Sequence, residues 1–133
     1  MFFIIDVFIF QKMLIYVKER FKNMGMNYYV VKKRPTCREP IHIGKSSYGW
    51  LFNFQDNEYW HTYPQVKQWL KDNTTKEDSE YVIIDEEDRI VTYEEFIQKV
   101  EDKQNDPKNL ANPDNFTYAK NIDGYRFSEG YFS

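Results

Sequence analysis

The alternation of apolar and polar positions predicts three strands in the first half of the chain. Residues 27–33 are β-branched and aromatic, which is typical of a strand. Two prolines bound the loop that follows, and a second strand is expected to begin at residues 41–43. The segment from Gly44 to Gly49 is expected to form a turn or a bulge, after which residues 50–55 resume as a third strand.

The third predicted strand has one aromatic face. Side chains alternate across a strand, so Trp50, Phe52 and Phe54 share a face. The opposite face carries Leu51, Asn53 and Gln55. We therefore expect the face with three rings to point into the core.

A first helix is predicted after residue 61. Thr62 is a suitable N-cap, and Pro64 suits the first helical turn. The helix is expected to run to about Asp72. Its inward stripe consists of Val66, Trp69 and Leu70.

The second half of the chain repeats a strand-to-helix order. Residues 80–85 are predicted to form a strand, and the unbroken apolar run at residues 81–84 predicts a central position covered on both faces. After an acidic turn, residues 89–91 are expected to pair back as a hairpin. Thr92 and Glu95 form a capping box that opens a second helix, expected to end near Gln104. Its inward side chains are Phe96, Ile97 and Val100.

These elements predict an α+β fold. We expect a small, mainly antiparallel sheet of four to five strands with two helices packed on one face. The predicted order is β-β-β-α-β-β-α over residues 26–104, followed by an irregular tail over residues 105–133. The tail is rich in aromatic residues, unlike a disordered segment, so part of it is expected to dock as a strand near residues 125–127.

Residues 1–25 are predicted to be an extension outside the domain. The apolar run at residues 1–17 lacks the basic start and the small-residue cleavage site of a signal peptide. Asp6, Gln11 and Lys12 interrupt it, which disfavours a membrane span. We hypothesise that translation starts at Met24 or Met26 and that the preceding residues are upstream sequence in the same frame.

The composition of the chain limits which kinds of functional site it can contain. A single cysteine among 133 residues excludes an internal disulfide framework and fits a reducing compartment. No group of cysteines and histidines has the spacing of a metal site, so we expect no metal and no cofactor. The net charge of −3 is unevenly distributed, because residues 73–133 hold fifteen acidic and seven basic side chains. A basic face is one interpretation of the remaining cations, and it would contain Lys32, Lys33, Arg34, Arg38 and Lys45.

The segment from Gly44 to Ser46 matches only the end of a phosphate-binding P-loop. The first glycine of that motif would fall at position 39, which is a glutamate, and the following residues predict a strand rather than a helix. The helix N-terminus that holds the phosphate in a P-loop is therefore not predicted.

A polar cluster at the same turn has three interpretations. The glycines could serve only the hairpin backbone, the turn could bind a phosphate or carboxylate, or a histidine could act in catalysis. The candidate ligand-binding side chains are His42, Lys45, Ser46, Ser47, Arg38 and His61. No complete catalytic set is evident, so no catalytic residue is assigned.

The run from Arg38 to Trp50 resembles a segment of small phage and prophage proteins of unknown function, with the pattern HIGKSSxGW. The strand-to-helix segment from Ile90 to Phe96 is similar to a later part of those proteins. The resemblance covers roughly residues 27–102 and implies a phage origin, a start near Met26 and a location in the host bacterial cytoplasm. It carries no assigned activity.

Three functions remain open from the sequence. The first is an accessory phage protein that binds a host or viral protein. The second is an anion binder, for nucleic acid or a nucleotide phosphate, that uses the turn from His42 to Ser47. The third is a small hydrolase or nuclease that uses His42 or His61. Nucleic acid is disfavoured by the pI of about 5.4, and no membrane partner is expected.

Overall fold

A mixed β-sheet organises the fold. The computed structural model describes residues 25–34, 40–116, 119–130 and 132. Within these residues the sheet has seven strands in the order β5-β4-β1-β2-β3-β7-β6. The strands are β1 (Met26–Lys32), β2 (Ile41–Ser46), β3 (Asn53–Gln55), β4 (Tyr81–Asp85), β5 (Ile90–Val91), β6 (Lys120–Ile122) and β7 (Tyr125–Ser128).

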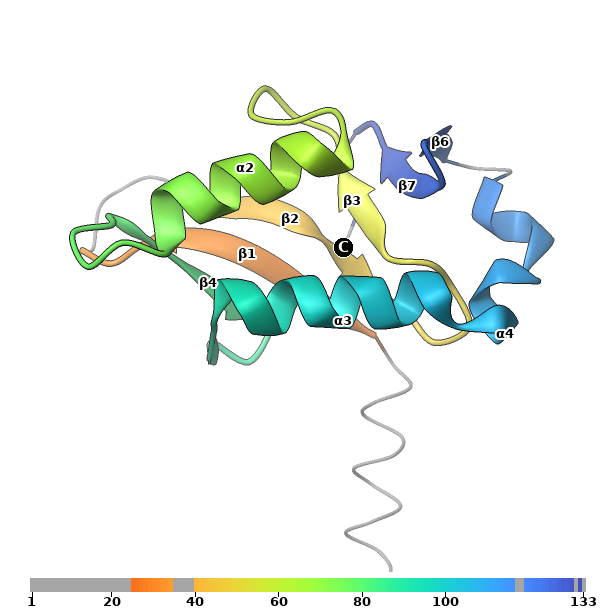
Figure 1. The fold of residues 1–133 in the computed structure, drawn as a ribbon, viewed down its shortest axis with the longest axis horizontal. Helices are drawn as coiled ribbons and strands as arrows, with labels where there is room; N and C mark the ends of the chain where they lie inside the picture. Colours follow the sequence, from red (N-terminus) through yellow and green to blue (C-terminus); the bar gives the residue numbers. More distant parts are fainter. Residues whose placement is uncertain (1–24, 35–39, 117–118, 131, 133) are drawn as a thin grey trace, which may run out of the picture.

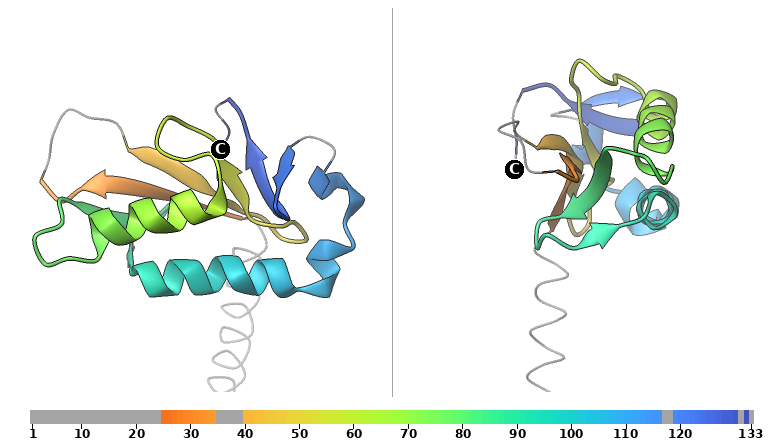
Figure 2. Two further views of the ribbon diagram at one scale, coloured as in Figure 1. Left: turned by 45° about the horizontal axis from the view of Figure 1, so that its top comes forward. Right: turned by 90° about the vertical axis from the view of Figure 1, so that its left-hand side faces the viewer.

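Two long helices lie side by side on one face of this sheet (Figures 1 and 2). They are α2 (Tyr63–Thr74) and α3 (Tyr93–Asn105). The predicted caps are confirmed: Thr62 accepts a hydrogen bond from the Gln65 amide, and Thr92 accepts one from the Glu95 amide. The short helix α4 (Pro107–Leu110) and the 3-10 helix η1 (Pro113–Phe116) then lead the chain around to β6.

The core between helices and sheet is built largely from rings. The Phe52 ring lies 4.6 Å from that of Phe54 and 5.5 Å from that of Phe96 on α3, measured between centroids. Phe127 on β7 stacks on Phe54 at 5.1 Å. Aromatic pairs at these distances add to the stabilisation gained from burying their area. The predicted inward residues Val66, Leu70, Phe96 and Val100 are all buried here, while Trp69 and Ile97 are partly buried.

The order β-β-β-α-β-β-α is confirmed, but the sheet is larger than the predicted four to five strands. The difference comes from the tail, which is not irregular. β7 pairs in parallel with β3, and β6 pairs antiparallel with β7. The expectation of an added strand near residues 125–127 is confirmed by β7, where Phe127 is fully buried.

Two predictions about strand faces are wrong. β4 is not central and doubly covered, because only the short β5 lies beyond it in the sheet. Of its apolar residues only Ile83 is buried. β3 begins at Asn53 rather than at residue 50, so strict alternation does not apply before it. Leu51 is therefore buried and Trp50 remains partly exposed.

β2 continues into the segment from Gly44 to Gly49 that was predicted as a turn or a bulge, and the chain turns only after Ser46. It extends to Ser46, and the register slips so that Tyr28 pairs with Gly44 while Tyr29 pairs with His42. Ile43 is thus the extra residue of a β-bulge. The bulge keeps Ile43 in the core and places His42 on the face of the sheet away from the helices.

The predicted extension at residues 1–25 lies almost entirely outside the described residues, which begin at Gly25. None of the helices described here is long and apolar enough to cross a membrane.

Candidate anion-binding pocket

The turn from Ser47 to Leu51 is held in place by a partly buried lysine. Lys103 on α3 donates from Nζ to the carbonyl oxygens of Ser47, at 2.6 Å, and Trp50, at 3.1 Å. Lys103 is partly buried, and this burial lowers the pKa of its ammonium group. Because the Lys103 ammonium group donates to two carbonyl oxygens of the turn, its role is to stabilise the conformation of the turn.

Two asparagines complete this clamp. Asn112 donates from Nδ2 to the Gly49 carbonyl at 2.9 Å, and the Leu51 amide donates to Asn115 Oδ1 at 3.0 Å. Asn115 is fully buried. The Trp50 amide donates to the Ser47 carbonyl at 3.2 Å. Because the amides of Trp50 and Leu51 are used internally, they do not form an anion-binding nest, and a P-loop geometry is absent from this turn.

A polar row crosses the helix-free face beside the turn. Directly paired residues of neighbouring strands point to the same face of a sheet. Lys45 of β2 pairs with Asn53 of β3, and Asn53 pairs with Arg126 of β7. The row continues to Asn27 of β1 on one side and Asn121 of β6 on the other. It contains two cations, three amides and no carboxylate.

A shallow pocket of about 190 Å³ lies over the centre of this row. It is lined by Lys45, Ser47, Trp50, Leu51, Asn53 and Arg126. Three strands and the clamped turn therefore contribute to a single hollow. Two of the predicted ligand-binding residues, Lys45 and Ser47, are brought together here.

Arg126 contributes a positively charged guanidinium group to the pocket. Its guanidinium carbon lies 4.7 Å from the centre of the Trp50 ring, a cation–π arrangement. Its Nε is buried without a hydrogen-bond partner among the described residues. Burial lowers the pKa of the guanidinium, whose ordinary value is so high that it stays charged. A buried donor without an acceptor is costly, and Arg126 is among the residues that line the hollow, so its guanidinium is available to an anion there.

The positive charge of the pocket is not neutralised from within. None of the ion pairs formed by residues 25–34, 40–116 and 119–130 involves Lys45 or Arg126. Asn53 Oδ1 accepts a hydrogen bond from Ser128 Oγ at 2.9 Å, so the amide nitrogen is its remaining polar group. The pocket thus presents donors and positive charge.

His42 lies in a separate, buried cluster on the same face. Its Nε2 is 2.9 Å from Asn27 Oδ1, and its Nδ1 is 3.3 Å from Gln55 Oε1. Asn27 Nδ2 donates to Glu86 and Gln55 Nε2 donates to the Gly130 carbonyl at 2.6 Å, so both amide oxygens lie toward the ring, and the neutral imidazole donates to one of them. Burial lowers the pKa of His42, with the contact to Gln55 opposing the shift. Both ring nitrogens have partners in the sheet, so this histidine serves the fold.

The other predicted site residues are not assembled with the pocket. Ser46 pairs with Met26 at the end of β2 and does not line the hollow. His61 is exposed and bonded to Asp56. Arg38 lies outside the described residues.

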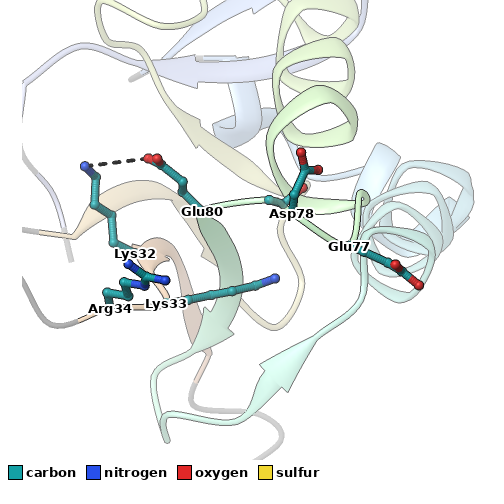
Figure 3. A pocket seen from close by; sticks show the side chains of 7 residues that line it. Lys32, Lys33, Arg34, Glu77, Asp78 and Glu80 are labelled. Carbon is teal, nitrogen blue, oxygen red and sulfur yellow. Dashed lines mark ion pairs between the residues drawn. The ribbon is translucent and has the colours of Figure 1, made fainter.

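A second and larger hollow, of about 520 Å³, lies between the end of β1 and the loop that joins α2 to β4 (Figure 3). It contains three of the five cations of the predicted basic face, but acidic side chains oppose them. Its charged lining residues are Lys32, Lys33, Arg34, Glu77, Asp78 and Glu80. Lys32 extends toward Glu80 and pairs with it at 3.9 Å (Figure 3). With opposite charges balanced, this hollow attracts an anion less than the Lys45 pocket does.

Sequence reasoning missed Arg126, Asn53 and Trp50 as site residues. Arg126 alternates with rings in the segment Tyr125–Phe127, which was a signal for a strand with one polar side chain on its outer face.

No group of three potential metal ligands occurs in the part of the chain that the structure describes. Comparisons with protein-family models, curated proteins and solved structures find no match to this chain.

Proposed function

We propose that this chain is a small binding module that holds an anionic group between Lys45 and Arg126. The observation that carries the proposal is the pocket itself: two cations without a carboxylate partner in the described chain, one of them with a buried, unsatisfied Nε. The proposed site differs from the anion site predicted from the sequence. Lys45 and Ser47 belong to both, whereas His42 and Ser46 do not line the pocket.

Physical chemistry favours an oxyanion over a neutral ligand. A guanidinium presents fixed, planar donors that suit carboxylate and phosphate oxygens, and hydrogen bonds between charged groups are the strong ones. Trp50 holds the Arg126 guanidinium by its ring face, and the clamp on the turn holds Trp50. The donors are therefore positioned before a ligand arrives, which reduces the entropic cost of binding.

The direct test is calorimetric titration of the protein with inorganic phosphate at low ionic strength. We expect Lys45→Met and Arg126→Met each to weaken binding by about tenfold or more, as is usual when a charged hydrogen bond is lost. The matched control is Lys120→Met, because Lys120 lies on the neighbouring β6 and is already paired with Glu129. Equal losses in all three variants would indicate general charge attraction and would overturn the proposal.

A second candidate is binding of a host or viral protein by an accessory phage protein. The helix-free face favours it through an apolar row in which Ile90 pairs with Ile84 and Ile84 pairs with Tyr29. The Ile90 side chain is 70% exposed at the edge of that row. A protein partner that uses this row should lose affinity in Ile90→Glu and keep it in Lys45→Met; the reverse pattern would reject this candidate.

The hydrolase hypothesis receives no such support. In the described chain His42 is held by Asn27 and Gln55, and His61 is bonded to Asp56 at an exposed position. Neither lines the pocket with Lys45 and Arg126.

A further inference from the structure

We propose that the anion is a backbone phosphate of single-stranded nucleic acid, held between Lys45 and Arg126 while an adjoining base stacks on Tyr48. The inference rests on the proposed anion-binding function and names the ligand of that same pocket. Three features of the molecule support it: the donor set, the exposed ring on the clamped turn, and the absence of acidic residues from the strands β2, β3, β6 and β7.

The donor set suits a phosphate better than a carboxylate. Four donor groups line the hollow: the ammonium of Lys45, the guanidinium of Arg126, the amide of Asn53 and the hydroxyl of Ser47. They come from β2, β7, β3 and the turn, so they are spread over four neighbouring segments of the chain. A carboxylate offers two oxygens in one plane, which a single guanidinium can satisfy. Phosphate oxygens project in several directions and can use all four groups.

The pocket is small and open, so it can hold one charged group of a molecule that continues along the surface. Its volume of about 190 Å³ is below the range usual for sites that enclose a whole small molecule. A polymer with a repeating phosphate fits this geometry, because each unit needs only a shallow site.

Tyr48 provides the stacking surface. Its side chain is 68% exposed, and it immediately follows the pocket residue Ser47. A Cβ placed on the neighbouring Gly49 would meet no atom within 4 Å, so the space next to the Gly49 backbone is open. The turn that carries Tyr48 is fixed from behind by Lys103 and Asn112. An exposed ring on a fixed turn is pre-organised to receive a base, and a tyrosine accepts any base because each has a π face.

The whole chain has a net negative charge, but the strands that form the surface around the pocket contain no acidic residue. The strands β2, β3, β6 and β7 together contain Lys45, Lys120 and Arg126 and no Asp or Glu. Lys120 is paired with Glu129, so Lys45 and Arg126 remain for the phosphate. One phosphate in the pocket predicts a weak salt dependence, with log K falling against log salt at a slope of about −0.7.

The test is fluorescence anisotropy with a labelled ten-nucleotide oligo-dT, alongside calorimetry with inorganic phosphate. Replacement of the ring in Tyr48→Leu should weaken oligonucleotide binding by about tenfold, in line with stacking of one base, and leave phosphate binding unchanged. Tyr48→Phe keeps the ring and should bind within about twofold of the parent. Lys45→Met should weaken both ligands, whereas Lys99→Met, an exposed change on α3, should weaken neither.

The outcomes separate this inference from the proposed function. Phosphate binding without oligonucleotide binding overturns the nucleic-acid inference alone, as does unchanged oligonucleotide affinity in Tyr48→Leu. Tighter binding of duplex DNA or of a phosphoserine peptide than of the single strand also overturns it. Failure to bind either phosphate or oligonucleotide overturns both proposals.

Discussion

The ammonium group of Lys103 donates a hydrogen bond to the carbonyl oxygen of Ser47, 56 residues earlier in the chain, at 2.6 Å. The same group reaches the Trp50 carbonyl. Through these contacts α3 fixes the turn whose other side forms the anion pocket. The position of Trp50, and with it that of the Arg126 guanidinium, therefore depends on a lysine that does not line the pocket.

Replacing Lys103 with methionine should loosen this turn. The carbonyls of Ser47 and Trp50 would lose their donor, and a lost buried hydrogen-bond partner costs about 1–3 kcal/mol. We expect a fall of that size in the free energy of unfolding, measured with urea. We also expect faster hydrogen exchange at the amides of Trp50 and Leu51. The exposed Lys99→Met on the same helix is the control, and equal effects in the two variants would contradict the clamp.

The buried His42 should make the protein less stable in acid. The unfolded histidine takes up its proton near a pKa of about 6.5, and burial lowers the pKa in the folded state. Between these two pKa values the unfolded state binds more protons, so the free energy of unfolding falls as the pH falls through that interval. The nearby charges act in opposite directions, since Lys45 lowers this pKa and Glu86 raises it.

The measurement is urea denaturation at pH 7.5 and at pH 5, on the parent and on His42→Gln. The variant should lose less stability on acidification than the parent, because glutamine does not titrate. A parent and a His42→Gln protein with the same pH dependence would show that His42 does not titrate with unfolding.

Gly44 should tolerate no side chain. A Cβ at this position would overlap the Asn53 carbonyl oxygen and the Phe52 ring. We expect Gly44→Ala to destabilise the protein by about 1–3 kcal/mol and to speed hydrogen exchange in β3. Gly49→Ala is the comparison: its φ of +80° makes alanine strained, but no atom lies nearby. Hydrogen exchange at the β3 amides should stay slow in Gly49→Ala. If it also stayed slow in Gly44→Ala, the close packing of Gly44 against Phe52 and Asn53 would be contradicted.

The tail should contribute to the stability of the whole sheet. Phe127 is fully buried and stacks on Phe54, so Phe127→Ala should lower the free energy of unfolding by about 3–5 kcal/mol. Lys120→Ala, at an exposed position on β6, should change it by less than about 0.5 kcal/mol. A single urea transition with an unchanged midpoint in Phe127→Ala would show that β7 does not belong to the cooperative unit.

Local signals predicted the elements more successfully than their arrangement. The caps at Thr62 and Thr92 depend on residues three positions away, so the sequence was sufficient to predict both helix starts. The face of Trp50 was predicted wrongly because alternation holds only within a strand, and β3 begins at Asn53. Similarly, an apolar run in β4 indicated burial on two faces, although such runs also occur where one face is only partly covered.

The pocket could be predicted only in part. Lys45 and Ser47 were recognised because glycines and polar residues cluster in that segment. Arg126 was not, because it reaches Lys45 only through the pairing of β2 with β3 and of β3 with β7. That parallel pairing joins residues more than seventy positions apart, and no local pattern specifies it. His42 was included for its chemical type, which does not show that the bulge turns it toward Asn27 and Gln55.

The most direct test of the central claim is to follow the Nε–H resonance of Arg126 by nuclear magnetic resonance during titration with inorganic phosphate. Arg126→Lys serves to assign the signal. The account predicts that this resonance shifts in a saturable manner, with the same dissociation constant that calorimetry gives, because the Nε–H belongs to the guanidinium that the phosphate contacts. Phosphate binding that leaves the Arg126 resonance in place would contradict the account.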